Sequence, residues 1–163
     1  MTPETLQTIL PIATELLKRN WLMGTAESCT GGMVATALTA VPGSSAWFAG
    51  ALVTYAVPWK ERLLGVPHEI IENQGVVSEP TVLAMLQGLR TRLGLDAGVA
   101  ISGIAGPGGA EPGKPVGTVV IGVFAGDCRK CETCHFSGDR EAVRRAATEH
   151  ALLMLERTLR EIP

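Results

Sequence analysis

The sequence has no long hydrophobic run and no excess of positive charge. No apolar segment approaches the roughly 20 residues that a helix needs to cross a bilayer, and residues 1–20 lack the apolar core of a signal peptide. The 14 Lys and Arg against 16 Asp and Glu give a net charge of −2, which provides no attraction for nucleic acid or an anionic membrane. These absences predict a cytoplasmic protein that binds neither nucleic acid nor membrane.

Aromatic residues are also scarce, at 4% of the chain, whereas Ala, Val, Leu and Ile supply most of the 46% that is hydrophobic. The 19 Gly and 10 Pro imply many tight connections. A length of 163 residues is typical of one domain with one sizeable core, and this composition suits packed helix and sheet layers better than a coiled coil. We therefore expect a single domain over residues 1–163.

The apolar periodicity predicts alternating helices and strands. Apolar residues at helical spacing, with Thr2 as cap and Pro3 in the first helical position, predict a helix over about 3–19. Further helices are expected at 31–39, 58–64 and 68–73, between Ser78 and Gly94, and from Asp139 onward. Strands are expected at 21–26, 47–56, 97–102, 116–124 and 128–137. The order predicts a three-layer α/β/α sandwich around a mixed, mostly parallel sheet.

Two glycine-rich turns follow the carboxyl ends of predicted strands, where open sheets bind ligands. In the first, Ala-Glu-Ser-Cys-Thr-Gly-Gly at 26–32, Ser28 lies between a strand and a helix with its hydroxyl exposed. The amides of Thr30, Gly31 and Gly32 would point outward at the positive end of the helix dipole and could hold a phosphate or an oxyanion. The alternative is that Ser28 or Thr30 only caps the helix and the glycines only permit close packing.

Several familiar catalytic signatures are missing. The chain has no G-x-S-x-G nucleophile elbow, and Gly31 stands where S-x-x-K would need a lysine after Ser28. Residues 108–114 spell G-x-x-x-x-G-K, but Pro115 replaces the Ser or Thr of a P-loop and a strand follows instead of a helix. This excludes the P-loop interpretation. The glycines of 103–109 fit a backbone cradle for a ligand and equally a flexible connection.

Basic side chains could complete such a site. Lys60 follows the only tyrosine, Tyr55, by five residues. It would act as a general base if it were desolvated near a serine, and otherwise it is a solvated surface lysine. Arg140, Arg144 and Arg145 occupy the first turns of the last predicted helix, where they could pair with nearby acids or reach a phosphate.

Most of the cysteines are clustered in a C-x-x-C-x-x-C-H segment whose soft ligands could bind zinc. Its members are Cys128, Cys131, Cys134 and His135. Alternating strand residues, however, face opposite sides of a sheet, and the haem-attachment pattern C-x-x-C-H inside the segment requires an exported protein. Surface thiols without a ligand are the leading interpretation, and no metal or cofactor is predicted. His68 and His150 have no neighbouring ligand in the sequence and are expected to be structural.

Short segments in a specific order and spacing extend over nearly the whole chain. They are AESCTGG at 26–32, PGSSAWF at 42–48, VTYA at 53–56, LLGV at 63–66, GVVSEP at 75–80, SGIAGPGG at 102–109, KPVGTV at 114–119 and FSGDREAVR at 136–144. Together they resemble the CinA C-terminal domain family, the nicotinamide mononucleotide deamidases. The resemblance implies one CinA C-terminal-type amidohydrolase domain over 1–163, which hydrolyses nicotinamide mononucleotide to nicotinate mononucleotide and ammonia without a required metal.

The resemblance also implies roles for individual residues. Ser28 would be the nucleophile, with Tyr55 and Lys60 as its proton-transfer partners. The residues expected to bind the substrate are Cys29, Thr30, Gly31, Gly32, Ser45, Ser102, Gly103, Ala105, Gly106, Arg140 and Arg144. The amides after Ser28 would stabilise the tetrahedral oxyanion. A homodimer without nucleic-acid or membrane partners is expected.

The chain departs from the family pattern in two places. Ala56-Val57-Pro58-Trp59 stands where family members commonly read S-N-E-A, which could alter the approach of Lys60, and the cysteine cluster is not a family feature. Three alternatives therefore stay open. The protein could be a catalytically silent nucleotide-binding module with Lys60 displaced, an amidase or esterase with other substrates, or a metal-dependent protein built on the cysteine cluster.

Overall fold

The structure is a computed structural model that describes the backbone of residues 3–163 and the side chains from residue 5 onward. Its elements, in chain order, are α1 (Pro3–Arg19), β1 (Met23–Glu27), α2 (Met33–Thr39), the 3-10 helix η1 (Ser44–Ala46), β2 (Phe48–Val53), α3 (Val57–Leu64), α4 (His68–Gln74), α5 (Glu79–Leu93), β3 (Ala97–Gly103), β4 (Thr118–Ala125), β5 (Cys128–His135) and α6 (Arg140–Glu161). Every predicted helix and strand is present within a few residues of its expected bounds. The predicted cap Thr2 lies outside the described residues.

One mixed sheet forms the centre, with the strand order β2-β1-β3-β4-β5. β1 pairs in parallel with both β2 and β3, whereas β4 pairs antiparallel with β3 and β5. The mixed sheet is confirmed, but parallel pairs are only half of the pairings and not the expected majority. β4 is buried along its whole length, and a continuous apolar run does not reveal in which direction a strand runs.

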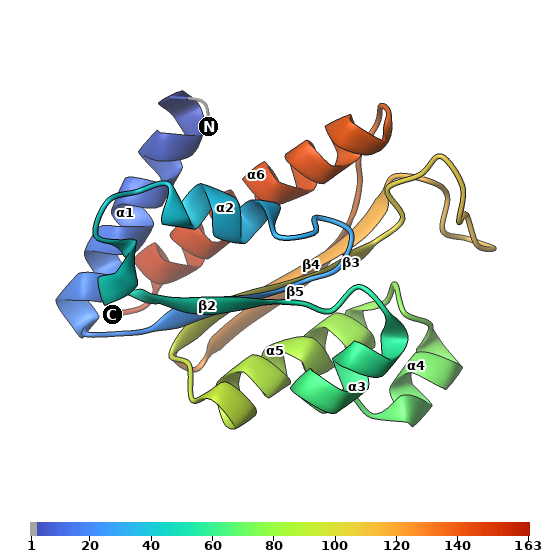
Figure 1. Cartoon of the computed structure of the whole chain (residues 1–163), viewed down its shortest axis with the longest axis horizontal. Helices are drawn as coiled ribbons and strands as arrows, with labels where there is room; N and C mark the ends of the chain where they lie inside the picture. Colours follow the sequence, from blue (N-terminus) through green and yellow to red (C-terminus); the bar gives the residue numbers. More distant parts are fainter. Residues whose placement is uncertain (1–2) are drawn as a thin grey trace.

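Helices cover both faces of the sheet (Figure 1). α1, α2 and α6 pack on one face, and α3, α4 and α5 pack on the other. Each face has its own cluster of buried apolar side chains, which includes Leu16 and Leu155 on the first face and Leu64 and Leu86 on the second. The three-layer sandwich is therefore confirmed. Among residues 3–163, no helix combines the length and the apolar character that a membrane crossing requires.

Local chemistry sets the ends of the two long helices that follow β2. At the start of α5, the Ser78 hydroxyl accepts a hydrogen bond from the Thr81 N–H at 3.3 Å, and Gly94 ends the helix with a left-handed φ of 65°. At the start of α6, Asp139 Oδ1 accepts from the Ala142 N–H at 2.9 Å. Both predicted starts and the predicted stop are confirmed.

α2 begins later than the sequence pattern predicts. Gly31 and Gly32 have φ values of 61° and 95°, which glycine adopts without strain but which a right-handed helix does not contain. The helix therefore starts at Met33 and not at Gly31. The two glycines instead turn the chain away from the end of β1, next to Ser28.

The two glycine-rich turns leave the same edge of the sheet. β1 and β3 run parallel with Glu27 opposite Ile101, so their carboxyl ends lie side by side. The Ser28 N–H donates to the Ile101 carbonyl at 3.0 Å, which extends the pairing by one residue. This edge is the place where the sequence predicts a ligand site.

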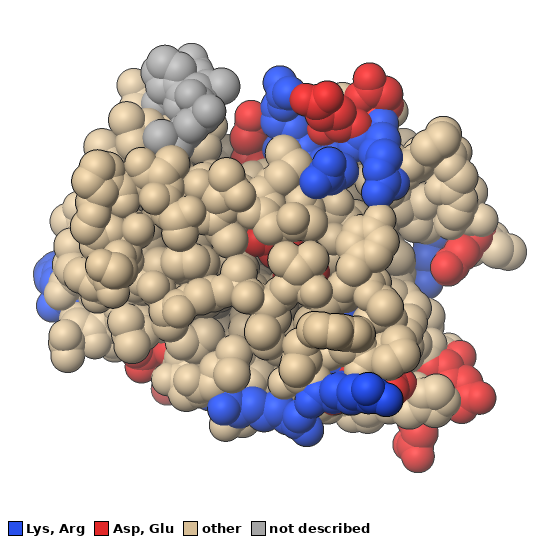
Figure 2. Space-filling view, viewed as in Figure 1, with Lys and Arg blue, Asp and Glu red and all other residues tan. Residues whose placement is uncertain are grey.

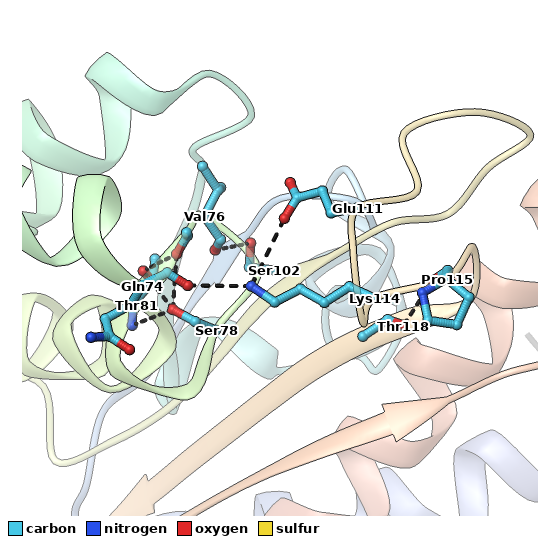
Figure 3. A network of polar contacts seen from close by, with 10 residues as sticks. Gln74, Val76, Ser78, Thr81, Ser102, Glu111, Lys114, Pro115 and Thr118 are labelled. Carbon is cyan, nitrogen blue, oxygen red and sulfur yellow. Dashed lines mark hydrogen bonds and ion pairs between the residues drawn. The ribbon is translucent and has the colours of Figure 1, made fainter.

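The glycine-rich loop after β3 is attached to the connection between α4 and α5 (Figure 3). Lys114 Nζ donates to the Gln74 carbonyl at 3.2 Å and lies 3.8 Å from the Glu111 carboxylate. The Ser102 hydroxyl donates to the Val76 carbonyl at 2.8 Å. The lysine of the G-x-x-x-x-G-K segment is thus held by protein acceptors, in agreement with the exclusion of a P-loop.

Candidate active site

Ser28 and Lys60 are in direct contact at the end of β1. Ser28 is the first residue after β1, and Lys60 belongs to α3. Lys60 Nζ lies 3.1 Å from Ser28 Oγ, and it donates to the Thr54 carbonyl at 2.5 Å and to the Tyr55 carbonyl at 3.4 Å. The Lys60 side chain is fully buried and Ser28 is 8% exposed. Lys60 is therefore not a solvated surface lysine.

The environment of Lys60 favours its neutral form. Burial lowers the pKa of Lys60 from 10.5 to about 8, and the neighbouring Cys29 sulfur opposes this shift only in part. At pH 7 roughly a tenth of the Lys60 amines are then neutral and able to accept the Ser28 proton. A serine in contact with such an amine is the arrangement of serine-lysine hydrolases.

The departure from the family pattern at 56–59 leaves Lys60 in place. α3 begins at Val57 with Pro58 in its first turn, where the missing N–H has no intrahelical partner to lose. Trp59 is 55% exposed, whereas Lys60, the next residue, is buried against Ser28. The structure thus removes the argument that this segment displaces Lys60 and silences the site.

Glu27 organises the turn, although the sequence reasoning did not place it in the site. Its carboxylate is fully buried and accepts hydrogen bonds of 2.7–3.2 Å from two hydroxyls and from amides at the start of α2. The donors are Thr25 Oγ1, Thr30 Oγ1 and the N–H groups of Gly32, Val34 and Ala35. A carboxylate is favourable there because the helix N-terminus carries partial positive charge. An acidic residue just before a predicted helix start is the signal that could have identified Glu27.

The amides predicted to hold an oxyanion are only partly available. Gly32 donates to the Glu27 carboxylate at 2.9 Å, and Gly31 donates to the Ser28 carbonyl at 3.0 Å. Both glycine donors are used inside the turn, so their predicted role is corrected. The amides of Cys29 and Thr30 face the Cys29 sulfur, which is only a weak hydrogen-bond acceptor, and they remain as candidate donors.

Arg144 fastens α6 to the turn. Its Nε donates to the Cys29 carbonyl at 2.9 Å and its Nη2 to the Thr30 carbonyl at 3.0 Å. Arg145, the next residue, forms an ion pair with Glu141 on the same helix. Pairing with a nearby acid is one of the two alternatives that the sequence predicts for this arginine. In the part of the chain from residue 5 on, no carboxylate pairs with Arg144, so its positive charge remains available at the site.

Arg140 links the glycine-rich loop to Tyr55. It donates to the Gly106 carbonyl at 2.7 Å and to the Tyr55 hydroxyl at 2.8 Å. Both acceptors are uncharged. Figure 2 shows basic and acidic side chains together over the start of α6. The Tyr55 side chain is 58% exposed. The structure therefore places the Tyr55 hydroxyl with Arg140 at the rim of the site, while Lys60 contacts Ser28 directly.

The comparison with known proteins identifies the family. A family model described as CinA C-terminal domain matches residues 6–159. The chain belongs to the CinA C-terminal domain family. The nicotinamide-nucleotide amidohydrolase PncC of Pseudomonas putida is 48% identical over 148 residues, which cover 88% of this chain and 92% of that protein.

Longer relatives and solved structures agree with this assignment. A putative competence-damage inducible protein of Symbiobacterium thermophilum is 48% identical over 88% of this chain but only 36% of its own length, so the chain spans about a third of such relatives. The crystal structure of the competence/damage inducible protein CihA from Agrobacterium tumefaciens has a TM-score of 0.93 at 35% identity and covers 99% of this chain and 98% of that one.

In this CinA domain, the thiol beside Ser28 is poorly suited to be a nucleophile. Cys29 is 4% exposed, and burial raises the pKa of its thiol to about 11 although Lys60 and Arg144 lie nearby. Its reactive thiolate is therefore rare at neutral pH.

A Cβ on Gly103 would lie 3.0 Å from the Cys29 sulfur, so the two glycine-rich turns of the CinA domain pack tightly together here.

The second turn, which the sequence predicts to bind substrate, is held by hydrogen bonds within the protein. Ser102 is buried, and its hydroxyl donates a hydrogen bond to the Val76 carbonyl. Ala105 is also buried. Gly106 has a φ of 84° and presents its carbonyl to Arg140. The turn is thus held in place by the contacts of Ser102 and Arg140, and its role as a ligand cradle stays a prediction.

Ser45 does not lie at this site. It is an exposed residue of η1, immediately before β2. β2 starts beside Met23 and runs parallel to β1, so η1 lies at the amino end of β1, whereas Ser28 follows its carboxyl end. Within one chain, Ser45 and Ser28 are therefore at opposite edges of the sheet, so Ser45 does not join Ser28 and Lys60 there, and its substrate contact stays a prediction.

The four members of the cysteine cluster do not converge. Cys131 packs with the apolar side chains on the α5 face of the sheet, whereas Cys134 packs with those on the α6 face. Cys128 lies at the opposite end of β5. This CinA domain therefore does not bind a single metal or haem through all four residues, as the alternation of strand residues indicates.

Proposed function

We propose that this protein is an amidohydrolase that converts nicotinamide mononucleotide to nicotinate mononucleotide and ammonia. The contact between Ser28 Oγ and the buried Lys60 amine is the observation that carries the proposal. The relative from Pseudomonas putida that matches over 92% of its length is named for this class of reaction. The reaction is assigned to the cytoplasm, the compartment that the sequence predicts.

The proposed chemistry divides the hydrolysis into two steps. The neutral Lys60 amine removes the Ser28 proton, and Oγ attacks the carboxamide carbon to form a tetrahedral intermediate. Lys60 then returns the proton to the leaving nitrogen, and ammonia departs from the nicotinoyl ester. In the second step Lys60 removes a proton from water, the hydroxide attacks the ester, and the proton passes to Ser28 Oγ as the carboxylate leaves.

The backbone next to Ser28 would stabilise the oxyanion of each intermediate. The Cys29 and Thr30 amides are the proposed donors, because Gly31 and Gly32 are already bonded inside the turn. The Tyr55 hydroxyl accepts a hydrogen bond from Arg140, whereas Lys60 contacts Ser28 Oγ directly, so the direct Lys60 route is the shorter one.

The arginines of α6 suit the phosphate of the substrate. The acceptors of Arg140 are a carbonyl and a phenol, and those of Arg144 are two carbonyls. Neutral acceptors leave the charge of each guanidinium uncompensated, and a guanidinium binds phosphate strongly with paired hydrogen bonds. We place the phosphate beside Arg140 and the glycine-rich loop at 103–109.

Ammonia release from nicotinamide mononucleotide tests the proposal. The wild-type protein should release ammonia equally with and without a chelator, and Ser28→Ala should lower the rate by at least about 10⁴-fold with an unchanged circular dichroism spectrum. A folded wild-type protein that binds the mononucleotide without ammonia release would identify a binding module. Turnover restricted to other acyl substrates would identify a different amidase or esterase.

We also propose that the protein is a homodimer that pairs through β2. β2 is an outer strand of the sheet with no charged residue, and Ala49, Gly50, Ala51 and Val53 are exposed on it. β5, the other outer strand, carries Arg129, Lys130 and Glu132, and charged side chains protect a strand edge from pairing. A second copy of the same neutral strand fits the β2 edge.

A further inference from the structure

We propose that Glu132, Cys134 and His150 form a binding site for a divalent transition-metal ion such as Zn²⁺, between β5 and α6. The carboxylate oxygen, the sulfur and the imidazole nitrogen of these residues all lie within 4.8 Å of one another. The proposed metal site is separate from the Ser28–Lys60 pair and does not depend on the proposed hydrolysis.

The fold brings these three residues together from distant parts of the sequence. Glu132 and Cys134 are two residues apart on β5, so their side chains point to the same face of the sheet. α6 packs on that face, and His150 lies on the side of α6 that meets β5. The sequence motif C-x-x-C-x-x-C-H groups Cys134 with Cys131 and His135, which point to the other face of the sheet. Sequence spacing alone therefore does not identify this site.

The orientation of His150 is already fixed toward the other two ligands. His150 Nε2 contacts Glu132 Oε1, and the imidazole ring packs edge-on against Phe136 with ring centres 5.8 Å apart. The Cys134 side chain is half-buried in the apolar cluster under α6. A metal ion would therefore find the histidine, the carboxylate and the thiol held on two rigid elements.

The donor set matches the ligands that zinc and cobalt prefer. Sulfur, imidazole nitrogen and carboxylate oxygen bind Zn²⁺ at 2.0–2.3 Å in a tetrahedron, so the ligand atoms stand roughly 3.3–3.8 Å apart. The three ligand atoms now lie within 4.8 Å of one another, and a bound ion would replace the direct contact between Glu132 and His150 by a bond from each residue to the metal. Binding replaces the Cys134 S–H bond by a sulfur–metal bond and releases the proton to solvent.

A surface hollow borders two of the three proposed ligands. The hollow has a volume of about 650 Å³, and Glu132 and His150 line it together with Leu153 and Arg157. Three protein ligands fill three positions of a tetrahedron, so water from the hollow would take the fourth. The proposed metal site is therefore open to solvent and to exchange, unlike a closed four-cysteine site.

Cobalt binding tests the proposal, because a Co²⁺–thiolate bond produces a charge-transfer absorption that carboxylate or imidazole ligands do not. The full-length protein, treated with chelator and then dialysed, should bind one equivalent of Co²⁺ with this absorption. Zn²⁺ should remove the absorption by competition and raise the melting temperature. Cys134→Ser should abolish the absorption, and His150→Gln should weaken Co²⁺ binding by at least about tenfold.

Cys131→Ser is the matched control, because it removes a thiol from the same strand but from the opposite face. Cys131→Ser and His135→Gln should retain the absorption and the Co²⁺ affinity of the wild type. Absence of thiolate absorption in the wild type would leave Glu132 and His150 as a simple ion pair and overturn the proposal. Loss of the absorption in Cys131→Ser, with the far-ultraviolet circular dichroism unchanged, would overturn it as well.

Discussion

At the scale of single residues, the proposed chemistry depends on the protonation state of Lys60. Its amine is fully buried, contacts Ser28 Oγ and donates hydrogen bonds to the carbonyls of Thr54 and Tyr55. No carboxylate among the side chains from residue 5 onward pairs with this amine, and burial lowers the pKa of Lys60 to about 8. The same residue type on the surface would remain protonated throughout the physiological range.

We predict that the activity of the protein rises with pH and levels off above about pH 8, because only the neutral Lys60 amine accepts the Ser28 proton. Lys60→Met should lower kcat by on the order of 10²–10⁴-fold. The measurement is the pH profile of kcat/KM for nicotinamide mononucleotide. A wild-type profile that is flat between pH 6 and 9 would contradict Lys60 as the base.

The folding stabilities of the wild type and of Lys60→Met give an independent test of the Lys60 pKa. Between about pH 8 and 10.5 the folded chain holds fewer protons at Lys60 than the unfolded chain. The free energy of unfolding of the wild type, relative to Lys60→Met, should therefore increase as the pH rises through that window. Denaturant titrations at several pH values measure the difference.

Arg140 provides a prediction about substrate recognition. Arg140→Met should raise KM for nicotinamide mononucleotide by roughly 10–100-fold, the value of a charge-assisted hydrogen bond to phosphate. The KM for nicotinamide riboside, which lacks the phosphate, should change little. Arg145→Met is the control, because Arg145 lies on the same helix and pairs with Glu141. Equal losses for the two substrates would show that Arg140 only positions the loop at Gly106.

At the scale of elements, Glu27 connects β1 to α2. Its carboxylate accepts hydrogen bonds from amides at the first turn of α2, which would otherwise have no acceptor. From α6, Arg144 donates to the carbonyls of Cys29 and Thr30 in the loop between β1 and α2. Ser28 is therefore positioned by three elements, although it belongs to none of them. The short helix α2 depends on this carboxylate, because Gly32 offers no side chain as a cap.

We predict that Glu27→Gln destabilises the protein by about 1–3 kcal/mol, because one acceptor oxygen becomes an NH₂ donor that faces other donors in a buried place. Activity should fall in parallel, since Ser28 loses its fixed position. Urea unfolding measures the change in free energy. Glu72→Gln, at an exposed position of α4, is the control and should stay within about 0.5 kcal/mol of the wild type.

The sequence predicts this part of the molecule unevenly. The motif at 26–32 identifies the turn, Ser28 and, through the family resemblance, Lys60. It does not reveal that Gly31 and Gly32 are left-handed or that Glu27 takes the Gly32 amide. These features depend on the backbone dihedrals of the two glycines and on the inward direction of the Glu27 side chain. Local residue patterns predict neither of them.

At the scale of the whole molecule, element types and layers are predictable and relative placement is not. Helix and strand periods appear in any short window, so each element is found in the sequence. The direction of β4, the far location of Ser45 and the division of Cys131 from Cys134 all depend on sheet topology. The same topology brings Glu132, Cys134 and His150 together, and their spacing in the sequence does not predict this cluster.

The proposed dimer leads to a prediction at this scale. Ala51→Lys places a charge on the exposed β2 edge and should convert the dimer to a monomer, because a buried unpaired charge opposes strand pairing. Sedimentation equilibrium of the wild type and the variant measures the association. Thr133→Lys adds the same charge to β5, the opposite edge, and should leave the dimer intact. A monomeric wild type would refute the assembly.

The contact between Ser28 and Lys60 joins two layers that have separate cores. Ser28 leads into α2, which packs in one cluster, and Lys60 belongs to α3, whose Leu64 packs in the other. Lys60 therefore reaches Ser28 only when α3 has packed on the sheet beside the end of β1. A chain in which α3 is not packed there carries an ordinary alcohol at Ser28, so the proposed activity would report that this helix has docked.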